Sequence, residues 1–202
     1  MTIETIRGYI EDIDNEISIL KTVVESNVQR NDIFAPMVVF YNRKNNQQVR
    51  DLVVVPKYYD DFSDRMRSVA EAMQLYSATR ASAVIVAMVN QIIADDNRCH
   101  ALTVFACNDD NAYMMQYPMT PQPDGSVEWH ENLIEIVSVD NYDYDETGRE
   151  LVSMLYMFVH MPNALFATSE LLSYLTYNNA AISDMNNSYS YYDMSLDNAE
   201  VQ

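Results

Sequence analysis

The sequence predicts an α+β fold, in which an antiparallel sheet of about five or six strands carries one packed helix. An N-terminal amphipathic helix and C-terminal helices complete it. Two observations lead to this prediction. A regular apolar stripe opens the chain, and short apolar runs separated by turn residues follow it, with one segment of helical spacing among them. The expected order after the first helix is β-β-α-β-β-β-β.

The N-terminal stripe has apolar residues spaced alternately three and four apart, which is typical of a helix with one apolar face. Its members are Ile3, Ile6, Ile10, Ile13, Ile17, Leu20 and Val24. Two interpretations remain open. The helix packs on its own domain, or it forms a coiled coil that joins copies of the chain or docks on a partner, because isoleucine at both core positions favours three or four strands.

A hairpin and a helix are expected next. Met37–Tyr41 and Leu52–Val55 are apolar runs on either side of the polar stretch "NRKNNQQ", which predicts a long connecting loop. Pro56 should end the second strand. Apolar residues of Asp60–Arg80 then recur three and four apart, and Asp60 or Asp61 is placed to cap this helix.

Four further strands follow, the first of them continuously apolar and therefore central. The four predicted strands are "SAVIVAMVNQII", "CHALTVFAC", "AYMMQYPM" and "SVEWHENLIEIVSV". The last two form a hairpin whose turn is "TPQPDG". Helices are expected at Arg149–Met161 and in "NALFATSELLSYL". We divide the chain into the helix of residues 1–30, one domain at 31–176, and an acidic Asn/Ser/Tyr tail at 177–202 that is expected to be disordered.

The charge of the chain is large and uneven. The formal net charge is −18. Residues 1–100 contain 11 Lys and Arg against 14 Asp and Glu, whereas residues 101–202 contain 1 against 16. Such a field repels nucleic acid and anionic membrane, so we expect neither as a direct partner. Three interpretations of this negative charge remain open. It keeps the protein soluble, it attracts a basic protein, or it imitates nucleic acid and so blocks a protein that binds nucleic acid.

No motif in the sequence predicts chemistry, so we expect a protein without catalytic activity, cofactor or metal. The histidines His100, His130 and His160 lack the spacing of a metal site. The segment "DNYDYDETGRE" has the alternating acids of a calcium loop, but it has Glu146 where such a loop needs glycine. A small enzyme whose groups meet only in the fold stays as an alternative.

Cys99 and Cys107 are about 26 Å apart along one expected strand at ~3.3 Å per residue, too far to bridge. We therefore expect two reduced, buried thiols and a cytoplasmic location. The longest apolar stretch, Leu151–Met161, is shorter than the roughly 20 residues of a membrane span. No secretory signal is expected either, because a basic segment followed by an apolar one does not open the chain.

The function expected from the sequence is binding of another protein, or assembly with copies of itself, with the N-terminal stripe as first contact. The layout is similar to that of small bacterial and phage proteins, and no motif fixes a family. Tyrosines of the C-terminal half, with Tyr142 and Tyr144 foremost, are the second expected contact, because tyrosine is enriched at interfaces. An inhibitor that imitates nucleic acid and a small enzyme are the alternatives.

Overall fold

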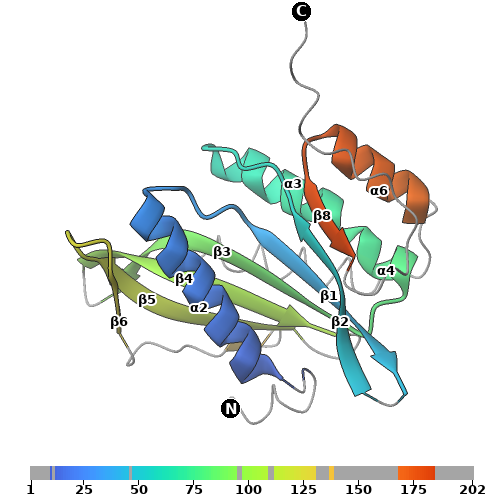
Figure 1. The fold of residues 1–202 in the computed structure, drawn as a ribbon, viewed down its shortest axis with the longest axis horizontal. Coiled ribbons are helices and arrows are strands. Elements are labelled where there is room, and N and C mark those ends of the chain that lie inside the picture. The colour runs from blue at the N-terminus through green and yellow to red at the C-terminus, as the bar shows by residue number, and fades with distance from the viewer. Residues whose placement is uncertain are drawn as a thin grey trace, which may run out of the picture.

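A computed structural model describes residues 10, 12–45, 47–94, 97–108, 112–130, 137–138 and 168–184 (Figure 1). The helices are α2 (Ile13–Arg30), α3 (Phe62–Met73), α4 (Leu75–Thr79) and α6 (Thr168–Tyr177). The strands are β1 (Met37–Lys44), β2 (Gln47–Val55), β3 (Ala83–Ala94), β4 (Asn97–Cys107), β5 (Ala112–Pro121), β6 (Val127–Trp129), β7 (Val137–Ser138) and β8 (Ala181–Asp184). The α+β class is confirmed.

All strand pairs of the described chain are antiparallel, as the sequence predicts, and they form one sheet in the order β6-β5-β4-β3-β1-β2-β8. The short strand β7 pairs with β5 as well. The strands β2 and β3 both run antiparallel to their common neighbour β1, so α3 and α4 carry the chain across β1. The apolar run that predicts a central strand is β3, which lies fourth in this order.

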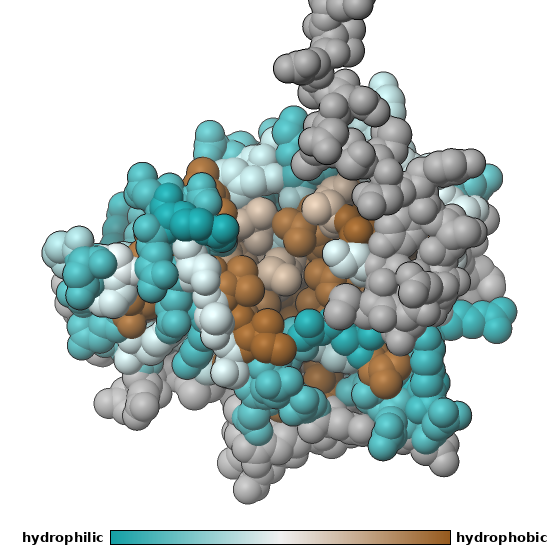
Figure 2. Space-filling view, in the orientation of Figure 1, coloured by the Kyte–Doolittle hydropathy of each residue, from teal (hydrophilic) through white to brown (hydrophobic). Residues whose placement is uncertain are grey.

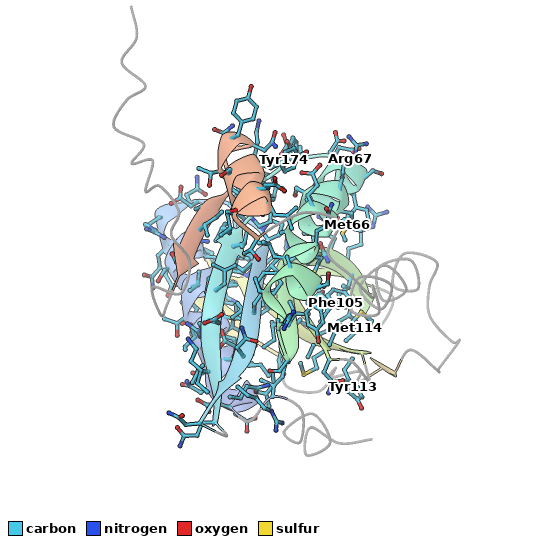
Figure 3. The ribbon with its side chains drawn as sticks, turned by 90° about the vertical axis from the view of Figure 1, so that its right-hand side faces the viewer. Met66, Arg67, Phe105, Tyr113, Met114 and Tyr174 are labelled. Atoms are coloured by element: carbon cyan, nitrogen blue, oxygen red, sulfur yellow. The ribbon has the colours of Figure 1, made fainter. Side chains whose placement is uncertain are left out.

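Helices cover both faces of the sheet, and each face has its own core. On one face, Phe40, Leu52 and Phe105 pack under α3, α4 and α6, and Figure 3 shows Met66 of α3 on the same side as Phe105 and Met114. On the opposite face, Val39 and Ile85 pack under α2. Successive strand residues point to opposite faces, which is why Val39 and Phe40 belong to different cores.

The first hairpin differs from its prediction because its turn is short. Lys44 pairs with Gln47, so the connection between the two strands is two residues long. Asn45 has a φ of 52°, the left-handed conformation that tight hairpin turns require and asparagine tolerates. Most residues of the polar stretch predicted as a loop belong to the two strands instead, beyond the apolar core. Backbone hydrogen bonds hold the strands together there, and these do not require apolar side chains.

The segment expected as one helix, Asp60–Arg80, contains two. α3 ends at Met73, and α4 follows after Gln74. Asp61 is the residue that caps α3, because its carboxylate accepts a hydrogen bond of 3.1 Å from the backbone N–H of Asp64. β2 ends at Val55, directly before Pro56, as expected.

The C-terminal region is folded further than the sequence indicates. After α6, the residues Ala181–Asp184 form β8 and pair with Leu52–Val55 of β2. The sequence assigns these residues to a disordered tail, since their only large aliphatic side chain is Ile182. Pairing with an existing strand satisfies their backbone groups, and Ile182 packs against the core that α6 also covers. The helix expected at Arg149–Met161 and the tail beyond Asp184 lie outside the described residues.

Candidate functional site

The N-terminal stripe lies against the sheet of its own chain. Ile10, Ile13, Ile17, Leu20 and Val24 are all buried, with at most 6 % of their surface exposed. They pack on alternate residues of β1, β3, β4 and β5. These five residues therefore pack on the domain to which they belong. A contact with a second chain through them would require α2 to leave the sheet. Ile3 and Ile6 lie outside the described residues.

A partly buried ion pair fixes α2 to the first hairpin. Glu16 of α2 is 5 % exposed and accepts hydrogen bonds from the hydroxyl of Tyr41 on β1 and from the guanidinium of Arg50 on β2, both at 2.5 Å. Burial, together with the negative charge of Glu16, raises the pKa of Tyr41 far above its ordinary value. The hydrogen bond and the charge of Glu16 outweigh desolvation at Arg50 and raise its pKa.

A second polar cluster fixes the opposite flank of α2 to β5 and β6. The ammonium of Lys21 lies 4.7 Å from the ring centre of Tyr117 and 4.8 Å from that of Trp129, which is cation–π contact on two sides. The indole N–H of Trp129 donates a hydrogen bond of 2.7 Å to Glu25. The two clusters hold α2 in one position and orientation across the sheet.

Between α2 and the strands β2 and β8, the surface has an apolar hollow (Figure 2). Val53 and Val55 of β2 point to the α2 face, because Val53 pairs with Val39 and Val55 follows two residues later. Ile19 and Val23 of α2 stand three and seven residues after Glu16, hence on the flank that faces β1 and β2. All four side chains are partly exposed.

We call this surface the α2 groove. It is lined by Ile19, Val23, Met37, Val53 and Val55, all of intermediate exposure. The Glu16–Arg50 ion pair contacts the same flank of α2. Ala181 and Ser183 of β8, which pair with Val55 and Val53, are exposed beside it. An antiparallel strand with one face in water normally alternates apolar and polar residues. Residues Leu52–Val55 are apolar on both faces, as in a strand covered on both sides.

The sequence does not predict this groove, because each lining residue also fits an ordinary place in a helix or a strand. Ile19 and Val23 fall beside the stripe and not within it. Val53 and Val55 belong to the apolar run that predicts the second strand of the hairpin. One feature of the sequence does point to it. The run "LVVV" is continuously apolar, whereas an antiparallel strand with one face in water alternates apolar and polar residues.

The histidines that the sequence offers do not meet in the described structure. His100 lies exposed on β4, opposite Gln91 and Met119. The ring of His130 is exposed and lies 2.8 Å from the hydroxyl of Thr120. Across the described ranges, no group of three His, Cys, Asp or Glu side chains is arranged to hold a metal ion. His160 and the acidic loop with Tyr142 and Tyr144 lie outside them.

Both cysteines are free thiols. Cys107 is buried, as expected, and burial raises the pKa of its thiol to about 12, so the thiol is protonated and unreactive at neutral pH. Cys99 is partly exposed, which differs from the expectation. It lies near the start of β4, beyond the strand residues that the helices cover.

No protein family, curated protein or solved structure matches this chain. Among the helices that the structure describes, none is long and apolar enough to cross a membrane.

Proposed function

We propose that this chain is an acidic binding protein that works by contacting another protein, or further copies of itself, through the α2 groove. The observation that carries this proposal is the apolar hollow beside α2, where Val53 and Val55 remain partly exposed although Leu52 and Val54, on the opposite face of the same strand, are fully buried (Figure 2). Contiguous apolar surface of this kind marks interaction sites on soluble proteins. The groove takes the place of the buried stripe as the expected contact.

Rigid support of the groove agrees with a binding role. Both walls are built on regular elements, and the Glu16–Tyr41–Arg50 cluster fixes α2 relative to the strands. A preformed surface loses little conformational entropy on binding. The free thiols of Cys99 and Cys107 favour a reducing compartment, so we propose that the partner is met in the cytoplasm.

Site-specific photo-crosslinking in the cells that produce the protein tests this function. A photoreactive amino acid replaces Val53 in the groove and, as the control, Tyr177 on α6, whose side chain is 83 % exposed. We expect one discrete cross-linked species from position 53 that position 177 does not give. Cross-links to a different protein or to a second copy both support a binding function. The absence of any species specific to position 53 would contradict it.

A further inference from the structure

We propose, building on the function above, that the partner contacts the α2 groove as an extended strand that takes the place of β8 on β2. The partner strand has larger apolar residues where β8 has Ala181 and Ser183. Three observations lead to this inference: the pairing of β8 with β2, the small side chains of β8 that face the groove, and the separate attachment of α6 to the core.

The pairing of β8 shows what kind of segment this side of β2 accepts. Ala181–Asp184 pair with Leu52–Val55 in an antiparallel register (Figure 1). When a strand is added to a sheet, main-chain hydrogen bonds supply affinity and alternate side chains supply specificity. An extended segment of another protein, aligned as β8 is, would make equivalent main-chain hydrogen bonds. The side chains therefore decide which of the two segments β2 prefers.

The side chains of β8 that face the groove are small. Ser183 lies opposite Val53, and Ala181 lies opposite Val55. Both β8 residues are exposed, and both valines remain partly exposed beside them. Opposed pairs of β-branched or aromatic residues stabilise an antiparallel pair of strands more than pairs with alanine do. Isoleucine or phenylalanine at these two positions would therefore cover apolar surface that Ala181 and Ser183 leave in contact with water.

The attachment of α6 to the core does not depend on β8. Leu171, Leu172 and Leu175 of α6 are buried, with at most 6 % of their surface exposed. Among the described side chains of β8, Ile182 packs on the same core, and it is only partly buried. β8 can therefore leave β2 while α6 stays in place.

β8 thereby selects among partner segments. A strand attached to its own domain competes at an effective concentration on the order of millimolar. A free segment with the same side chains does not displace it at micromolar concentration. A segment with larger apolar residues opposite Val53 and Val55 gains contacts that β8 lacks, so it can replace β8. The internal strand excludes poorly matched segments from the groove.

The test uses fluorescent peptides as probes, because the natural partner is unidentified. One peptide has the natural sequence of residues 179–186, "NAAISDMN". The second has isoleucine in place of Ala181 and Ser183, and the third has the residues of the second in scrambled order. Each is titrated with the full-length protein, and binding is followed by anisotropy. We expect the isoleucine peptide to bind about tenfold more tightly than either control, because it alone covers both valines.

A disulfide between β2 and β8 tests whether β8 has to leave. Val54 and Ile182 lie directly opposite each other, and opposed residues of an antiparallel pair have Cα atoms ~4.5–5.5 Å apart, within the range of a disulfide. Val54→Cys and Ile182→Cys are combined with Cys99→Ser, and thiol counting verifies that the bond forms. We expect the oxidised chain to bind the isoleucine peptide about tenfold more weakly than the same chain after reduction, because the bond keeps β8 on β2.

A second variant tests the same competition without a covalent bond. Ala181→Ile combined with Ser183→Ile gives β8 the side chains that the partner strand is expected to have. We expect this chain to bind the isoleucine peptide about tenfold more weakly than the natural chain, because its own β8 now matches β2 as well. Tyr177→Ile adds an isoleucine to exposed α6 instead, and it should leave binding unchanged.

The outcomes separate this inference from the proposed function. Equal binding of the isoleucine and scrambled peptides, or equal binding by the oxidised and reduced chains, would overturn the replacement of β8. A photo-crosslink from position 53 that forms to the same extent in the disulfide-locked chain would overturn it too, while leaving the binding function intact. Loss of all cross-links specific to position 53 in the natural chain would instead remove the function on which the inference rests.

Discussion

The hydroxyl of Tyr41 donates a 2.5 Å hydrogen bond to the carboxylate of Glu16, although the two residues are only 6 % and 5 % exposed. This contact joins the N-terminal helix to a strand 25 residues later. The carboxylate is paired by Arg50 as well, so no charge is buried alone at this point.

Replacing Tyr41 by phenylalanine removes only the hydroxyl that bonds to Glu16. We expect the free energy of unfolding to fall by about 1.5–3 kcal/mol, the value of a hydrogen bond to a charged group. Urea unfolding followed by circular dichroism measures it. The exposed Asp64–Arg67 pair is the control, and Arg67→Ala should cost less than ~1 kcal/mol. A loss at Tyr41 no larger than that of the control would show that the buried contact contributes little.

Trp129 is the only tryptophan of the chain, and its contacts with Glu25 and Lys21 make its fluorescence a reporter of α2. We expect Glu25→Ala to shift the emission to longer wavelength, because the indole N–H then turns to water for its hydrogen bond. Glu25→Gln keeps an acceptor and should preserve most of the native spectrum. An unchanged spectrum in Glu25→Ala would mean that the indole does not depend on α2.

The two thiols should differ sharply in reactivity. Cys99 is partly exposed, whereas Cys107 is buried with its pKa raised to about 12. With a disulfide reagent at pH 8, we expect one thiol per chain to react in the native protein and two in urea. Cys99→Ser should abolish the native reaction. Rapid modification of two thiols under native conditions would contradict the burial of Cys107.

Stability should fall in alkaline solution, because burial raises the pKa of Cys107 from 9.0 to about 12 in the folded chain. Its contribution is fully present below pH 9 and is lost as pH rises toward 12, since the unfolded chain releases the proton first. The slope is at most ~1.4 kcal/mol per pH unit for one group.

Burial also raises the pKa of Tyr41 and Tyr117, which adds to the same decline at higher pH. Urea midpoints at pH 8 and pH 10.5 measure the loss for the natural chain and for Cys107→Ala. The variant should lose up to ~2 kcal/mol less between these pH values. Identical losses in both proteins would exclude Cys107 as a source.

One substitution is expected to stabilise the fold. Arg80 follows α4 with a φ of 55°, a left-handed conformation that costs a residue with a side chain about 1 kcal/mol or more. Arg80→Gly should therefore raise the free energy of unfolding by about 0.5–1 kcal/mol after the greater chain entropy of glycine is counted. Asn31→Gly, at a φ of 57°, should change it little, because asparagine tolerates this conformation. A destabilised Arg80→Gly would contradict the argument.

The class of the fold and most elements follow from local patterns in the sequence. Short apolar runs bounded by turn residues predict β1 and β5, and helical spacing predicts α2 and α3. Two elements do not follow. The turn at Asn45 lies in a polar stretch that reads equally well as strand or loop. β8 has too little apolar content to be noticed, and it forms because β2 offers a pairing edge.

The α2 groove could not be predicted because exposure depends on the arrangement of elements in space. Val53 and Leu52 are adjacent and similar in the sequence, yet Leu52 is fully buried and Val53 is partly exposed. The difference arises because Leu52 lies within the core that α3, α4 and α6 cover, whereas Val53 is only partly buried against the core that α2 covers. The number and position of covering helices is a tertiary property that no residue pattern in β2 encodes.

Removing the first 30 residues would not be a neutral way to study assembly. The buried side chains of α2 form one wall of the core on their face of the sheet, and deleting them would expose Ile85, Leu102 and Met115 to water. We therefore expect such a truncated chain to be insoluble or unfolded, which is why point substitutions in the groove are the better experiment.

The bond between Glu25 and Trp129 closes a loop of 104 residues. On the ribosome, at about 5–20 residues per second, the first partner waits on the order of 5 to 20 s for the second to be made. For much of that interval the strands that cover the isoleucine-rich face of the nascent helix are still incomplete. Chaperones that shield apolar segments during synthesis should accordingly have a strong influence on the yield of this protein.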